Sequence, residues 1–220
     1  MRPATAIIVK DVIIELRNKE SLSSMLMFGL MVLIVFNFAF GRSADIVAIA
    51  PGVLWIAFSF AAILGLNRSL AVELDNECLQ GLLLAPLNRG DLYLGKVASN
   101  FVFITISELV ILVPFVLFYN QNFDSKILWI MGVTAVATLG IAAIGTILST
   151  ISANTRMREV MLPVLQIPLI VPVIICAVEA TMLILSGERE GISFWFSLLG
   201  GFSIVYLTTS YLIFEYAVEE

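Results

Sequence analysis

Six apolar stretches dominate the chain, and polar residues are concentrated at its two ends and in the segments between the stretches. The stretches are 22–40, 47–66, 97–119, 127–153, 160–186 and 192–215. Each is close to the roughly 20 residues that an α-helix needs to cross the hydrocarbon core of a bilayer. Together they fill more than half of the chain and leave no room for a separate soluble domain. We therefore expect an all-α integral membrane protein with six transmembrane helices in one domain, 1–220.

The segment before the first stretch has a different pattern, that of an amphipathic helix over 5–20. Such a helix is too polar to span the membrane and is suited to lie in its interface. The alternative is an extension of the first span. The apolar stripe of this helix is formed by Ile8, Val12 and Leu16, one turn apart, with Val9 and Ile13 beside them.

The longest polar insert is the connection 67–96, between the second and third stretches. Within it, helical spacing gathers Leu74, Cys78, Leu79, Leu82 and Leu83 into one apolar stripe. Pro86 ends this short helix, because a residue before proline disfavours helical geometry, and Asp91 is expected to cap the next one. The charged side of the insert is larger than a connector needs, which favours a docking surface for a soluble partner. A merely solvated loop is the alternative.

The composition supports the membrane assignment and narrows the chemistry. The chain is 60% hydrophobic and 13% charged, with a mean hydropathy of +1.03, whereas roughly a quarter of the residues of a soluble domain are charged. It contains no histidine, which excludes intramembrane hydrolases built on Ser–His or on zinc held by His. We expect a protein that is not an enzyme on its own and that has no metal site and no nucleic-acid partner.

A short match to a phosphate-binding loop is misleading. Residues 90–96 fit the pattern G-x-x-x-x-G-K. Val97 follows where a Ser or Thr should hold magnesium, and the intervening residues are bulky. We therefore expect no nucleotide site in this chain.

The distribution of Lys and Arg predicts the orientation. Lys and Arg are retained on the cytoplasmic side of a membrane protein. Nine of the 12 fall on one side of the six-span topology: Arg2, Lys10, Arg17, Lys19, Arg68, Arg89, Lys96, Arg156 and Arg158. The other side holds Arg42, Lys126 and Arg189. Both termini and the 67–96 connection should therefore face the cytoplasm.

Polar and helix-disrupting residues inside the stretches are candidates for function. Glu108 and Glu179 lie within the third and fifth, where an ionisable group is costly. The fifth also contains Pro163, Pro168 and Pro172, which should kink or break its helix. We regard these five residues as candidates for gating or for a pathway, with a static kink as the alternative for the prolines. Gly145, Ser149 and Ala153 form a small-residue stripe suited to close helix packing.

The polar insert carries a resemblance to known proteins. Its residues 73–96 resemble the cytoplasmic loop of permeases of ATP-binding-cassette (ABC) exporters, where a coupling helix contacts the ATPase subunit. The resemblance implies ATPase-coupling roles for the matching residues of this chain and its neighbour Glu77. The positions assigned to coupling are Glu73, Asp75, Glu77, Leu79, Leu82, Leu83, Pro86 and Arg89.

A narrower resemblance covers nearly the whole chain. Residues 50–73 and 162–180 resemble the second span and the proline-rich fifth span of the haem exporter protein B family. These are permease subunits of bacterial cytochrome c maturation. The resemblance implies an inner-membrane homodimer that works with a cytoplasmic ABC ATPase, a haem-handling membrane protein and a periplasmic haem chaperone. ATP would be bound by the ATPase, and haem would be handled as a substrate rather than held as a cofactor.

Two functions remain within that family: outward movement of haem, and ATP-driven release of haem-loaded chaperone. The generic coupling loop alone would also fit an exporter of lipid, drug or saccharide. A membrane scaffold without transport activity is a further alternative.

Overall fold

The computed structural model describes residues 3–17, 19–40, 46–75, 88–119, 125–153, 158–188 and 190–217. Its described residues form seven α-helices: α1 (Pro3–Arg17), α2 (Lys19–Phe40), α3 (Ile46–Asp75), α5 (Arg89–Phe118), α6 (Ser125–Ala153), α7 (Arg158–Ser186) and α8 (Ile192–Ala217). The six from α2 onward are long and apolar enough to cross a membrane. The expected all-α fold with six spans is confirmed.

The helix bounds follow the apolar stretches closely except around the polar insert. The helix α3 continues past the apolar stretch to Asp75, and α5 begins at Arg89 rather than at residue 97. The first turns of α5 are stabilised by tertiary contacts, since Tyr93 is buried and its ring lies 5.2 Å from that of Phe214 in α8. The polar segment 89–96 is therefore helical because its apolar residues, such as Tyr93, are covered by another helix.

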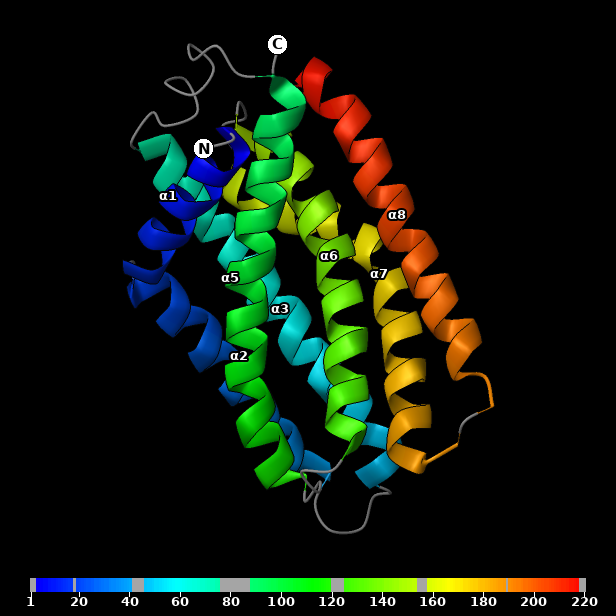
Figure 1. Cartoon of the computed structure of the whole chain (residues 1–220). Helices are drawn as coiled ribbons and strands as arrows, with labels where there is room; N and C mark the ends of the chain where they lie inside the picture. Colours follow the sequence, from blue (N-terminus) through cyan, green and yellow to red (C-terminus); the bar gives the residue numbers. More distant parts are fainter. Residues whose placement is uncertain are drawn as a thin grey trace.

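The bundle is arranged around α3 and α6 (Figure 1). The helix α6 packs against α5, α7 and α8, while α3 packs against α2 and α7. Most of the membrane-length part of α3 is buried, including the fully buried Trp55 and Phe58, whereas α8 is mostly exposed. The mostly apolar exposed face of α8 is what a helix at the lipid boundary requires.

The N-terminal helix α1 packs mainly against α5. Its Ile7 and Asp11 are buried, while Val9, Ile13 and Ile14 are exposed. The helix therefore has an apolar outer face, which includes Val9 and Ile13, the residues expected beside the apolar stripe. The predicted helix over 5–20 is in fact two elements, because α1 ends at Arg17 and α2 begins at Lys19.

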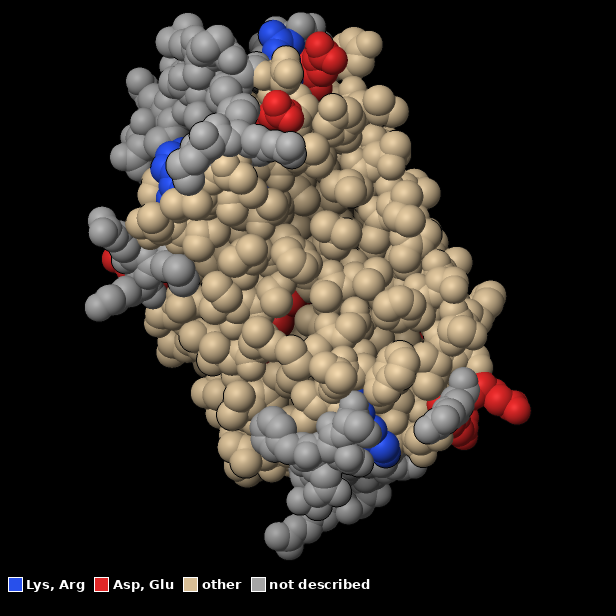
Figure 2. Space-filling view, in the orientation of Figure 1, with Lys and Arg blue, Asp and Glu red and all other residues tan. Residues whose placement is uncertain are grey.

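Charges in the described part of the surface gather mainly at the two ends of the bundle and near the start of α2 (Figure 2). Between the ends runs a broad uncharged belt over α5 and α6, interrupted by acidic atoms at the bottom of a recess. A belt of this kind matches the hydrocarbon region of a bilayer.

Glycine allows close packing on α6. A Cβ on Gly145 would clash with Cδ1 of Leu66 and lie 3.0 Å from Nε2 of Gln166. A Cβ on Gly140 would lie 2.8 Å from Oγ of Ser203. Gly145 therefore packs as the small-residue stripe predicts, and Gly140 is a second close contact that the stripe did not include.

Candidate functional site

The residues assigned to ATPase coupling lie within and on both sides of residues 76–87, which the structure does not describe. Glu73 and Asp75 belong to the last turn of α3, and Arg89 is the first residue of α5. The remaining five, Glu77, Leu79, Leu82, Leu83 and Pro86, lie outside the described residues. The middle of the polar insert, residues 76–87, is called the insert from here on. It lies between two 30-residue helices, each about 45 Å long.

The start of α5 is attached to the end of α8. Nη1 of Arg89 donates a hydrogen bond to the carbonyl oxygen of Glu215, at 3.3 Å. This carbonyl is in the last turn of α8, where carbonyl groups have no partner within the helix and a cation is favourable. Arg89 therefore joins one stem of the insert to the C-terminal helix.

The match to a phosphate-binding loop is entirely helical. Gly90 to Lys96 lie within α5, so their backbone follows helical geometry rather than that of a phosphate-cradling loop. Asn88, not Asp91, is the N-cap residue, and its carbonyl accepts the N–H of Leu92 at 3.1 Å. Asp91 instead lies in the first turn, where a carboxylate interacts favourably with the helix dipole.

Glu108 is fully buried between α5 and α6. The hydroxyl of Thr138 in α6 donates to Oε2 of Glu108 at 2.6 Å, while Oε1 has no hydrogen-bond partner among the described residues. A carboxyl group with one donor and no ion pair among the described residues is unusual in a membrane span, where such groups are costly. Acidic atoms show at the bottom of the recess over the α5–α6 seam in Figure 2.

Two further hydrogen bonds cross the same seam. The hydroxyl of Tyr93 donates to the carbonyl oxygen of Ala143 at 3.1 Å. The side-chain amide of Asn100 donates to Oγ1 of Thr146 at 2.9 Å. Tyr93, Asn100 and Glu108 are seven and eight residues apart, so they lie on one face of α5. The seam is therefore polar along much of its length.

Gln166 of α7 is a second buried polar group without a described partner. It is fully buried, and neither its Oε1 nor its Nε2 is hydrogen-bonded within the described structure. It lies beside Gly145, whose missing side chain leaves room for the amide. Buried polar groups are normally hydrogen-bonded, to water where no protein group is available. Gln166 and Glu108 are thus two of the buried side chains that have an unpaired polar atom within the described structure.

The fifth span does not break. The helix α7 is continuous from Arg158 to Ser186 through Pro163, Pro168 and Pro172, so a break at the prolines is wrong, while a kink stays a prediction. A compensating contact comes from α8, since the hydroxyl of Tyr206 donates to the carbonyl oxygen of Leu169 at 2.5 Å. Leu169 lies in the turn before Pro172, where the ring and the missing N–H disturb backbone pairing.

Glu179 does not join Glu108. It is half-buried on α7, with no hydrogen bond or ion pair to another described residue. The helices α5 and α7 share no extensive interface, so the two acids belong to separate parts of the bundle. The structure thus places the pathway candidates on two helices that share no extensive interface rather than in one cluster.

The sequence interpretation missed the polar partners of these groups. Thr138 belongs to a run of threonines on α6, with Thr134, Thr146 and Thr150 at multiples of four residues. That spacing is a signal of a polar face. Asn100 and Gln166, single amides within apolar stretches, are signals of the same kind.

Comparisons with known proteins place this arrangement in a family. The sequence model of the family described as CcmB protein matches residues 2–220. The chain is 25% identical over 175 residues to Heme exporter protein B of Rhodobacter capsulatus, covering 79% of this chain and 80% of the relative.

Two further relatives have the same name. Heme exporter protein B of Haemophilus influenzae is 27% identical over 173 residues, covering 78% of this chain and 77% of that protein. Heme exporter protein B of Escherichia coli K12 is 30% identical over 88 residues, which are 40% of each chain.

Proposed function

The chain belongs to the CcmB protein family, and from this membership we propose that it is the membrane subunit of an ABC-type haem exporter in c-type cytochrome biogenesis. In this proposal the subunit is a single permease domain of the bacterial cytoplasmic membrane. Its two termini and the insert 76–87 face the cytoplasm, in keeping with the excess of Lys and Arg on that side.

The observation that carries the proposal is the family match over 2–220, together with relatives named Heme exporter protein B. The architecture supports it. Both helices that flank the insert are 30 residues long, more than the roughly 20 that a bilayer requires. Helices of this length can present a connecting segment to a soluble partner at the membrane surface.

The partner that fits this segment is a cytoplasmic ABC ATPase. We propose that the leucine stripe of the insert docks in the ATPase and that Glu73, Asp75, Glu77 and Arg89 surround the contact. Closure of the ATPase on ATP would then move α3 and α5. A second copy of this subunit, a haem-handling membrane protein and a periplasmic haem chaperone complete the proposed assembly.

The side chains favour a role in movement over a role in tight haem binding. The chain has no histidine, and imidazole is a common axial ligand of haem iron. ATP-driven movement would therefore serve either haem export or release of haem-loaded chaperone, with haem held mainly by partners. We propose Glu108, Glu179 and the prolines of α7 as groups that respond to this movement.

The test is to purify the subunit together with its partner ATPase. Leu79→Asp and Leu82→Asp place a charge on the apolar stripe and should prevent co-purification, while membrane insertion is retained. Leu82→Met, which keeps the stripe apolar, is the matched control. Wild-type yield and activity of the ATPase with both Asp variants would refute the docking assignment.

A further inference from the structure

The helices α2 and α3 form a continuous antiparallel pair. Three contacts join them at increasing depth: Glu20 with Arg68, Met25 with Gly65, and Phe28 with Phe60. As the position rises along α2, it falls along α3, which is the pattern of two antiparallel helices in register. These contacts resist sliding of one helix along the other.

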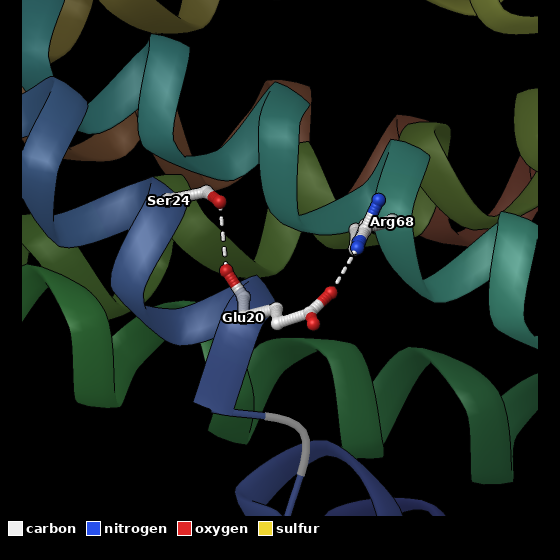
Figure 3. A network of polar contacts seen from close by, with 3 residues as sticks. All are labelled: Glu20, Ser24 and Arg68. Carbon is white, nitrogen blue, oxygen red and sulfur yellow. Dashed lines mark hydrogen bonds and ion pairs between the residues drawn. The ribbon is translucent and has the colours of Figure 1, made fainter.

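The contact at the end of this series is an ion pair (Figure 3). Nη2 of Arg68 lies 2.5 Å from Oε2 of Glu20. Glu20 is in the first turn of α2, where a carboxylate is favoured by the helix dipole, and its carbonyl oxygen accepts the hydroxyl of Ser24 at 2.7 Å. The pair is largely open to solvent, since the side chains of Arg68 and Glu20 are 49% and 78% exposed.

The next contact brings the two backbones close together. Met25 is fully buried, and a Cβ on Gly65 would lie 2.6 Å from its Cε and 2.8 Å from its Sδ. The absence of a side chain at Gly65 thus lets Met25 sit against α3, one turn from Arg68. The ion pair and this contact together hold the start of α2 on α3.

The junction between α1 and α2 is attached to both stems of the insert. Through the ion pair it is joined to α3, the helix that leads into 76–87. Through α1, which packs mainly on α5, it is joined to the helix that leaves this segment. A relative movement of the two stems would therefore act on the α1–α2 junction, beside the direct contacts of α2 and α3 with α5.

We propose that the Glu20–Arg68 ion pair is the link through which movement of α3 reaches the α1–α2 junction. The inference rests on the proposed coupling function and deepens it by naming the residues that connect the insert with the N-terminal helix. Glu20 and Arg68 act as positioning residues: they hold α2 and α3 together at the insert end, so that both move as one body.

The test is a charge swap in the complex of the subunit and its ATPase, reconstituted in phosphatidylethanolamine–phosphatidylglycerol vesicles. The variants are Glu20→Arg, Arg68→Glu and the double swap, with Glu188→Arg in the outer connection as a control. Each single variant places like charges together and should lower subunit-dependent ATP hydrolysis by about two- to fivefold, the range for one exposed pair. The double swap should restore it, and the control should equal wild type.

Co-purification of the ATPase is measured in the same preparations. It distinguishes a failure of the proposed coupling function from a failure of the Glu20–Arg68 link. The ATPase should co-purify with every variant, since the docking segment is unchanged. Single variants with wild-type hydrolysis, or a double swap no better than the weaker single variant, would overturn the link. Failure of the ATPase to co-purify with the wild-type subunit would overturn the proposed function and the link with it.

Discussion

The carboxyl group of Glu108 has one hydrogen-bond donor among the described residues, the hydroxyl of Thr138. The two side chains meet in the core of the bundle, and both are fully buried. Removal of one member of a buried polar pair leaves the other unsatisfied, whereas replacement of both by apolar groups of similar shape can be nearly neutral. A comparison of the single and double variants can therefore distinguish a structural role of Glu108 from a functional one.

We predict that Thr138→Val lowers the stability of the purified subunit by about 1–2 kcal/mol, because the carboxyl loses its donor. The double variant Glu108→Leu with Thr138→Val should regain most of this stability while haem-dependent cytochrome maturation in cells is lost. Melting in detergent and a maturation assay measure the two effects. Full maturation by the stable double variant would remove Glu108 from the proposed pathway.

At the scale of the helix, the proline-containing helix α7 receives a hydrogen bond to its backbone from the neighbouring helix α8. Pro172 has no N–H to bond the carbonyl of Pro168, and its ring disturbs the preceding turn. The hydroxyl of Tyr206 reaches this turn from α8 and bonds Leu169. The continuity of α7 therefore depends in part on a side chain that is far away in the sequence.

We predict that Tyr206→Phe destabilises the subunit by about 0.5–1.5 kcal/mol through the loss of one hydrogen bond. The cost should be smaller in a Pro172→Ala background, where the backbone donor is restored. Tyr216→Phe, at a position 72% exposed on the same helix, is the matched control and should leave melting unchanged. An equal cost in both backgrounds would show that Tyr206 does not compensate for Pro172.

Close packing of α6 on α8 gives another prediction at this scale. Gly140→Ala places a methyl group 2.8 Å from Oγ and 3.3 Å from Cα of Ser203, and overpacking of this kind costs about 1–3 kcal/mol. Gly132→Ala on the same helix has no neighbour within 4 Å and should gain about 0.5–1 kcal/mol from helix propensity. Melting temperatures that fall together would contradict this packing.

For the whole molecule, the orientation can be tested directly. Single cysteines at Ser43, Gln121 and Glu190, in a background without Cys78 and Cys176, should react with a membrane-impermeant maleimide in intact cells. Cysteines at Asn88 and Asn154 should react only after the cells are opened. Reaction of Asn88→Cys from outside would invert the proposed topology and leave the insert without access to a cytoplasmic ATPase.

The sequence predicted the elements well because the length of an apolar stretch directly reports a membrane crossing. It expected the N-cap of this helix at Asp91, whereas the N-cap of α5 is Asn88, since the contact of Arg89 with α8 comes from elsewhere in the bundle rather than from local pattern. It identified Glu108 but not Thr138, which is 30 residues away. Which face of one helix meets which face of another depends on packing, and spacing within a single helix does not report it.

The contact between the start of α5 and the end of α8 has a consequence for biosynthesis. Tyr93 packs against Tyr211 and Phe214, and Arg89 bonds the carbonyl of Glu215. The ribosome makes these partners more than 100 residues after the start of α5, so the third span enters the membrane before its covering helix exists. A chain that stops before Phe214 would leave the ring of Tyr93 without this cover. Completion of the last helix is thus the step at which a nascent chain can hide this surface from membrane quality control.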